Sequence, residues 1–238
     1  MPETLHMLEL PLDPDALIRF AQDHGVNRNR DEDLGYALHA WLKALLNDMA
    51  PKPFRLLTGR QPRLLGYTTH TGEALLEHAL TYASPQSSAV SDLHNLANAK
   101  PMPTVWRSGR ELGFEVLLCP TSRLHGAEKD RYRHLLEHRD THPVSEQSDQ
   151  TPPTREAVYR AWLMEQMGQT ARLKSAHMER FQFVSQYRKG LKKKLDRPQA
   201  LFRGILEVQD SSGMNSLLSR GIGRHRAFGY GMLLLRPT

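Results

Sequence analysis

A tyrosine, a histidine and a lysine recur at helical spacing in this sequence, as Tyr36, His39 and Lys43. At about 100° per residue, these three side chains project from the same side of a helix. A phenol, an imidazole and an ammonium can together orient a nucleophile, transfer a proton near neutral pH and neutralise a phosphate, as metal-free RNA cleavage requires. Exposed helix edges often carry these residues for solubility alone. The spacing by itself favours that simpler interpretation, so other features must support the chemistry.

A second candidate site interleaves glycines with basic residues near the C-terminal end. Its members are Gly221, Gly223, Arg224, His225, Arg226, Gly229 and Gly231. Glycine lets backbone amides approach an RNA backbone closely, and arginine can contact its phosphates. The segment follows a predicted helix and enters a predicted strand, the reverse of the order in a dinucleotide-binding motif. The alternative is a turn packed tightly against a sheet, which suits Gly229 and Gly231 better than the basic centre.

A third candidate is a basic arm at the tip of a predicted hairpin. Its cations are Arg188, Lys189, Lys192, Lys193 and Lys194. Such an arm could lie along an RNA duplex and contact its phosphates. Most charge runs are solvated loops, but the density of this cluster in a net-basic chain favours RNA.

Composition limits the classes of protein that need considering. The chain has 238 residues, 39% of them hydrophobic, and a formal net charge of +6, which indicates a folded protein and favours a polyanionic partner. The one cysteine, Cys119, excludes an intrachain disulfide and a cysteine-rich zinc site. No basic leader is present, and no apolar run approaches the roughly 20 residues that span a bilayer. We therefore expect a cytoplasmic protein with no metal, no small-molecule cofactor and no membrane contact.

The elements predicted to position these residues occur in the same order twice. In the first half, they are a strand at 5–12, a short helix at 14–23, a helix at 34–49, strands at 54–58 and 64–69, a helix at 72–82 and a strand at 102–106. In the second half, they are a strand at 112–119, a helical, histidine-bearing segment, a polar linker at 141–153, a helix at 154–167, strands at 181–187 and 200–208, a helix at 210–219 and a strand at 228–235.

Apart from the additional segments, each half has the order strand, helix, strand, strand, helix, strand. This order predicts an α+β protein of two tandem ferredoxin-like (RRM-like) βαββαβ domains with antiparallel sheets, at 1–109 and 110–238. Helices cover one face of such a sheet, and RNA-recognition modules bind RNA on the other face.

Two pairs of residues are interpreted as structural. Trp41 and Trp162 lie on apolar helix faces and are expected in the core rather than stacked on bases. His134 and His138 are four residues apart in the helical segment, but no cysteine or matched carboxylate completes a zinc set. Neither pair is expected to carry chemistry.

Two C-terminal segments carry the most specific resemblance to a known family. They are Ala200 to Leu206 (ALFRGIL) and Gly221 to Leu235 (GIGRHRAFGYGMLLL), with weaker similarity at 36–39, 155–167 and 179–181. On these motifs the chain is similar to the CasE family, the CRISPR repeat-RNA endoribonucleases of type I-E Cascade complexes. The resemblance implies two tandem ferredoxin-like domains, in agreement with the repeated order of elements.

The resemblance also implies an activity and its residues. A Tyr-x-x-His pair of the family maps onto Tyr36 and His39, and a basic residue farther along the helix maps onto Lys43. It implies metal-independent cleavage at the 3′ base of a CRISPR repeat hairpin by 2′-hydroxyl attack, with a 2′,3′-cyclic phosphate and a 5′-hydroxyl as product ends. His39 would act as general acid or base and Tyr36 would position it. The mature crRNA would stay in an effector complex with other subunits.

Three alternatives stay open at this point. The segments at 25–30 and 84–100 depart from the family pattern, so the chain could be the processing subunit of another CRISPR effector. It could instead be a non-catalytic RNA-binding subunit, which would keep the basic surfaces while His39 merely decorates a helix. It could also be an unrelated RNA-binding ferredoxin-like protein.

Overall fold

The computed structural model describes residues 4–26, 34–124, 127–141, 153–186 and 195–238. The predicted basic arm lies outside these residues, in its cations Arg188, Lys189, Lys192, Lys193 and Lys194. Most of the predicted linker at 141–153 lies outside them as well. The RNA contacts of the basic arm therefore stay predictions.

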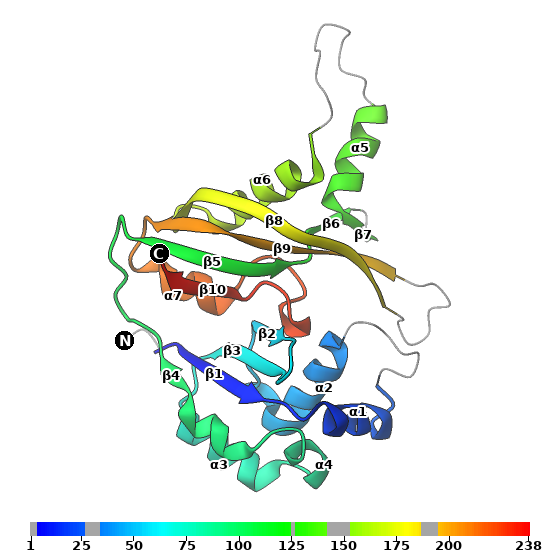
Figure 1. The fold of residues 1–238 in the computed structure, drawn as a ribbon, viewed down its shortest axis with the longest axis vertical. Coiled ribbons are helices and arrows are strands. Elements are labelled where there is room, and N and C mark those ends of the chain that lie inside the picture. The colour runs from blue at the N-terminus through cyan, green and yellow to red at the C-terminus, as the bar shows by residue number, and fades with distance from the viewer. Residues whose placement is uncertain (1–3, 27–33, 125–126, 142–152, 187–194) are drawn as a thin grey trace, which may run out of the picture.

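The N-terminal half of the chain forms a four-stranded antiparallel sheet (Figure 1). In the spatial order β2-β3-β1-β4, its strands are β1 His6–Pro11, β2 Phe54–Leu57, β3 Arg63–Thr68 and β4 Lys100–Pro101. Its helices are α1 Pro14–Asp23, α2 Gly35–Leu46, α3 Gly72–Tyr82 and α4 Pro85–Ser88, with 3₁₀ turns η1 Asn47–Met49 and η2 Leu93–Asn98. Helix α2 lies between β1 and β2 in the chain, and α3 lies between β3 and β4.

The C-terminal half forms a second four-stranded antiparallel sheet. In the spatial order β10-β5-β9-β8, its strands are β5 Glu111–Leu118, β8 Ala171–Gln186, β9 Leu195–Val208 and β10 Leu233–Pro237. Its helices are α6 Arg155–Met167 and α7 Gly213–Arg220, followed by the 3₁₀ turn η3 Arg226–Phe228. Between β5 and α6 the chain forms the hairpin β6 Thr121–Leu124 and β7 Ala127–Asp130, and then α5 Arg131–Thr141.

The two sheets have equivalent topologies. In each, the first and third strands of the βαββαβ order lie at the centre, which is the ferredoxin-like arrangement. The predicted fold class is thereby confirmed. The division of the chain into 1–109 and 110–238 stays a prediction.

Each sheet buries one face against its helices, as the alternation of apolar residues predicts. In the first sheet, Leu8 and Leu64 pack in one core with residues of α1, α2 and α3. In the second, Phe114 and Phe202 pack in another core with residues of α6 and α7. Trp41 and Trp162 are 0% and 4% exposed, which confirms that they are core residues.

The helix-free faces of the two sheets turn toward each other. Tyr67 of β3 donates a hydrogen bond from its hydroxyl to the backbone carbonyl of Leu233 in β10 at 2.9 Å. Arg55 of β2 forms an ion pair with Glu115 of β5 at 3.5 Å. The face that RNA-recognition modules leave open is therefore partly covered here by the other half of the chain.

The strand predicted at 102–106 is wrong. Strand β4 ends at Pro101, and Trp106 instead donates from Nε1 to Asn215 of α7 at 2.8 Å. Pro101 and Pro103 lack the amide hydrogens that would extend the ladder. This segment therefore serves as a connection that packs against the second half of the chain.

Three other strands have different bounds from those predicted, and the first of them, β9, begins at Leu195 rather than 200. Strand β8 begins at Ala171 rather than 181, because its first half carries charged residues at the sheet edge, which hide the strand from a hydrophobicity pattern. Strand β10 begins at Leu233 rather than 228, because Gly229 and Gly231 adopt positive φ and η3 occupies the start of the predicted strand. The hairpin of β6 and β7 was not predicted.

Candidate active site

Helix α2 presents Tyr36, His39 and Lys43 away from the core. Its apolar stripe, which includes Leu38 and Leu42, is buried against the first sheet. Tyr36 is 54% exposed, Lys43 is exposed, and His39 is partly buried. The helical spacing therefore places the three residues as the sequence predicts, with the imidazole reachable rather than enclosed in the core.

The C-terminal glycine-rich loop reaches α2 through Phe228. The ring of Phe228 lies 5.1 Å from the His39 ring and 6.2 Å from the Tyr36 ring, measured between centroids. The Tyr36 and Phe228 rings are nearly parallel, with 23° between their planes. Two of the predicted candidate sites, one on α2 and one in the glycine-rich loop, therefore lie next to each other although they come from opposite halves of the chain. Phe228 was not predicted as a site residue, although it lies within 221–235, a segment that carries the resemblance.

Lys43 is held by acidic and amide groups at the end of α2. Its Nζ donates to Asp48 Oδ1 at 2.8 Å and to Asn47 Oδ1 at 3.3 Å. Exposed ion pairs of this kind add little to the stability of a fold. An arriving phosphate can therefore replace Asp48 as the partner of Lys43 at small cost.

The His39 imidazole has a pKa below its ordinary value of 6.5. Partial burial disfavours the charged ring, and the positive charges of Lys43 and Lys52 disfavour it further. At neutral pH the ring is therefore neutral and able to accept a proton. Lys52 was not predicted as a site residue, because it lies beyond the end of α2 and only the folded chain brings it near His39.

The Lys43→Gln substitution is expected to raise the pKa of His39 toward 6.5, because it removes one of the two nearby positive charges. An NMR titration of the imidazole proton resonances measures this shift. Lys174→Gln is the matched control, since Lys174 pairs with Glu111 and Glu207 on the second sheet. An unchanged His39 titration in Lys43→Gln would contradict the electrostatic account.

The lowered pKa of His39 also affects the pH dependence of folding stability. The contribution of His39 to stability is full above pH 6.5 and is lost as the pH falls through the folded-state pKa.

The glycines of the loop pack against protein atoms. Gly221, Gly223 and Gly231 have φ of 66°, 73° and 75°. A Cβ on them would lie 2.9 Å from the Gly231 oxygen, 2.6 Å from the Trp162 ring and 2.2 Å from the Ile222 oxygen, respectively. Gly229, at φ 89°, would bring a Cβ to 3.4 Å from Phe54. The alternative of a tightly packed turn thus applies to most of the loop.

Two of the amides predicted to approach RNA are already bonded within the protein. The N–H of Gly221 donates to Leu217 O at 2.9 Å, and the N–H of Gly231 donates to Leu117 O at 2.7 Å. Contact of these two glycines with RNA would have to use other atoms. The RNA contacts of the loop glycines stay predictions.

The three basic residues of the loop have different environments. Arg224 is exposed. Arg226 donates from its guanidinium to the carbonyl of Arg220. The side chain of His225 is only 10% exposed, and its Nε2 pairs with Glu128 of β7. Arg224 is therefore the best placed of the three to meet RNA, whereas His225 anchors the loop to the β6–β7 hairpin.

Glu128 is the acceptor that fixes this anchor. Its Oε1 also accepts a hydrogen bond from Thr121 Oγ1 at 2.6 Å. Burial alone would raise its pKa, but the bonds from His225 and Thr121 lower that pKa to about 2. The carboxylate is thus ionised at neutral pH.

Three side chains within the described residues could hold a metal ion. Donor atoms of Cys119, Glu128 and His225 all lie within 4.8 Å of one another. A thiolate, a carboxylate and an imidazole form a donor set of the type that binds zinc. The cysteine count argues against a cysteine-rich site but not against this mixed set, which only the fold assembles.

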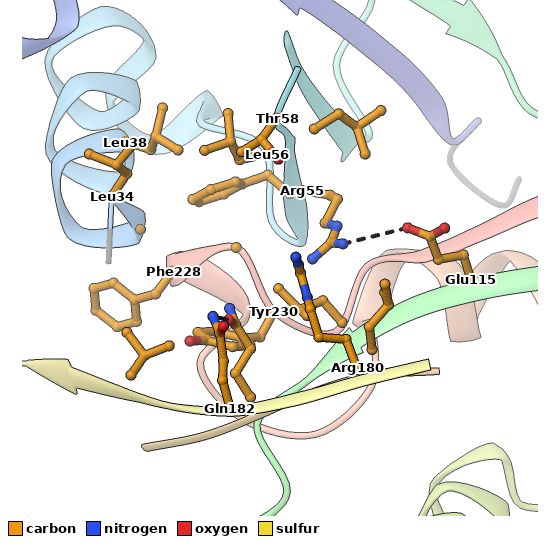
Figure 2. A pocket seen from close by; sticks show the side chains of 18 of the residues that line it. Leu34, Leu38, Arg55, Leu56, Thr58, Glu115, Arg180, Gln182, Phe228 and Tyr230 are labelled. Carbon is orange, nitrogen blue, oxygen red and sulfur yellow. Dashed lines mark hydrogen bonds and ion pairs between the residues drawn. The ribbon is translucent and has the colours of Figure 1, made fainter. Parts of the chain in front are cut away.

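A cleft lies on the other side of Phe228, between the two sheets (Figure 2). Its volume is about 880 Å³, and its walls include Arg55 of β2, Glu115 of β5 and Arg180 of β8. These residues are far apart in the sequence, and although Arg180 lies in the segment 179–181 of the resemblance, no role was implied for it. Sequence reasoning missed all of them for that reason.

A family model identifies the protein family to which the chain belongs. Residues 5–237 match the model of a family described as CRISPR associated protein. The chain belongs to this family of CRISPR-associated proteins. The predicted membership is thereby confirmed, over almost the whole length of the chain.

Solved structures similar to this CRISPR-associated protein agree with its fold. The CRISPR endoribonuclease Cse3 bound to a 19-nucleotide RNA is 23% identical, with a TM-score of 0.63, and the match covers 98% of this chain and 100% of that one. Cas6e from Escherichia coli K-12 is 20% identical, with a TM-score of 0.58 and the same coverage. A chain of a CRISPR RNA-guided surveillance complex is 14% identical, with a TM-score of 0.60 and again 98% and 100% coverage.

No curated protein sequence matches this CRISPR-associated protein. Within the part of the chain that the structure describes, every helix is too short or too polar to cross a membrane.

Proposed function

We propose that this CRISPR-associated protein is an endoribonuclease that binds the hairpin of CRISPR repeat RNA and cleaves at its 3′ base without a metal. The observation that carries the proposal is the position of His39. Its ring has a lowered pKa, lies beside Tyr36 and two lysines, and contacts Phe228 of the C-terminal loop. The similarity in fold to a protein named as a CRISPR endoribonuclease supports the same activity.

The arrangement suits attack by a ribose hydroxyl on the adjacent phosphate. Neutral His39 takes the proton of the 2′-hydroxyl, and the 2′ oxygen then bonds to phosphorus. The bond from phosphorus to the 5′ oxygen breaks, and that oxygen takes a proton from solvent at the exposed side of the site. The products end in a 2′,3′-cyclic phosphate and a 5′-hydroxyl. Lys43 and Lys52 neutralise the charge that develops on the phosphate, and Tyr36 positions the imidazole.

Arg224 of the loop and the cations of the basic arm at 188–194 are the proposed phosphate contacts that hold the RNA. The product stays bound as mature crRNA together with other subunits of an effector. The likeness to a chain of a CRISPR RNA-guided surveillance complex supports this retention.

Cleavage of repeat RNA in excess chelator tests the proposal. The purified protein is expected to cut a repeat hairpin despite the chelator, and mass spectrometry should find a 2′,3′-cyclic phosphate or its 3′-phosphate hydrolysis product. A substrate with a 2′-deoxy sugar at the cleavage site should stay intact, because it lacks the nucleophile. If RNA binds but is never cut, the protein is a non-catalytic RNA-binding subunit. Cutting that the chelator stops would point instead to a metal at Cys119, Glu128 and His225.

A further inference from the structure

The cleft between the two sheets contains two arginines that face each other. Arg55 projects from β2 and Arg180 from β8, and their guanidinium groups extend toward one another across the cleft (Figure 2). Arg55 is nearly enclosed, with a side chain 8% exposed, and its Nε has no hydrogen-bond partner among the described residues. Two like charges at close range disfavour each other, and burial strengthens that effect. An anion between them would remove this cost.

The carboxylates of the cleft do not supply an anion between Arg55 and Arg180. Glu115 and Glu179 both accept from Arg203, at 2.8 and 2.7 Å. Glu115 also pairs with Arg55, but at the longer distance of 3.5 Å. Among the residues that the structure describes, Arg180 has no ion-pair or hydrogen-bond partner. Arg55 and Arg203 thus take up the two carboxylates, and the positive charge of Arg180 is left for a ligand.

A β-bulge aims Arg180 into the cleft. The pairing of β8 with β9 changes register between Met178 and Arg180, so that Glu179 is the extra residue. Without the bulge, alternate residues would face the cleft, and 179 and 180 would lie on opposite faces. With it, both line the cleft, and Arg180 shares a face with Gln182. Bulges recur beside functional sites because they redirect a side chain in this way.

We propose that Arg55 and Arg180 clamp a phosphate of a single-stranded segment that flanks the hairpin of the bound RNA. The proposal rests on the proposed function for the identity of the RNA. The cleft adjoins the candidate active site through Phe228, which lines the cleft and contacts His39. A strand that leaves the cleavage site therefore enters the cleft directly.

The size and lining of the cleft fit a single strand. A volume of about 880 Å³ is that of a site for a small molecule, too small for a duplex. Single-stranded RNA is commonly bound by cations along its backbone and aromatic rings against its bases. Here Arg55 and Arg180 supply the cations, and the half-buried ring of Phe228 supplies an aromatic face.

Affinity for two RNAs tests the clamp, in the His39→Ala background so that the RNA stays intact. One RNA is the repeat hairpin alone, and the other keeps its single-stranded flanks. Arg180→Ala is expected to weaken binding of the flanked RNA about tenfold, the loss typical of one charge-assisted contact, and to leave the hairpin alone unchanged. Arg180→Lys should recover part of the loss. Arg172→Ala is the matched control, since Arg172 is an exposed arginine of β8 that pairs with Glu207 outside the cleft.

Other outcomes overturn the clamp. The clamp is refuted if Arg180→Ala binds both RNAs as tightly as its parent does. It is also refuted if Arg180→Ala loses the same affinity for both RNAs, because an equal loss indicates a general charge effect. If Arg180→Ala weakens binding of another effector subunit but not of RNA, the anion is a protein carboxylate. Cleavage by the chain with His39 present is measured in parallel. A flank-dependent loss without any cleavage would leave the clamp standing and refute the proposed endoribonuclease.

Discussion

Replacing His39 with alanine is expected to slow cleavage of repeat RNA by about 10²- to 10⁴-fold, the range typical of a lost general acid or base. RNA affinity should be nearly unchanged, because the cations that hold the phosphates remain. Single-turnover cleavage at saturating protein measures the chemical step apart from product release. The wild-type rate should fall as the pH drops through an apparent pKa below 6.5, because the neutral ring is the active form and its pKa is lowered.

A second histidine provides the control for this loss. His78 is also partly buried on a helix and also contacts an aromatic ring, that of Tyr82, at 5.0 Å between centroids. It lies on α3, which does not line the candidate active site. His78→Ala should therefore cleave at the wild-type rate. A His39→Ala protein that cuts as fast as the wild type would refute the catalytic role of the imidazole.

The Gly231→Ala substitution is expected to lower the free energy of unfolding by about 2–4 kcal/mol. Gly231 has φ of 75°, and a Cβ there would lie 2.2 Å from the backbone oxygen of Ile222. The backbone must then shift, which breaks the hydrogen bond from Ile222 N to Gly231 O, now 2.8 Å. Urea denaturation at equilibrium measures the loss. Cleavage should fall as well, because the shift moves Phe228 away from His39.

The loss in Gly231→Ala has two causes, the backbone strain at positive φ and the close contact of the added Cβ with Ile222. Gly109 serves to separate them. It has φ of 78°, close to that of Gly231, but a Cβ there would meet no atom within 4 Å. Gly109→Ala should therefore cost only the backbone strain, about 1–2 kcal/mol. Equal losses in the two variants would mean that the close contact with Ile222 contributes nothing.

The local pattern of the sequence was sufficient for most of the fold. Apolar residues at helical spacing predicted α2 because a helix must bury one side, and the same spacing placed Tyr36, His39 and Lys43 together on the other side. Helix starts were equally local, because Asp13 accepts hydrogen bonds from the amides of Asp15 and Ala16 in α1. Thr154 likewise accepts one from the amide of Ala157 in α6. The repeated order of elements then gave two ferredoxin-like sheets.

Strand ends were less predictable, because pairing partners and backbone conformation set them. The proline-rich segment after β4 contains apolar residues but leaves the sheet to pack on α7. Gly229 and Gly231 end a strand pattern through their positive φ, which hydrophobicity does not encode.

The assembly of the site was decided by the tertiary structure. Lys52 and Phe228 reach His39 only because the chain folds back, and His225 turns inward to Glu128 instead of joining Arg224 at the surface. In the same way, Arg55 and Arg180 face each other only because two sheets meet. The sequence by itself determined which side of each helix or strand is buried, since that depends on spacing along the chain. Which side chains meet across elements depends on how whole sheets pack, and that packing is a property of the complete fold.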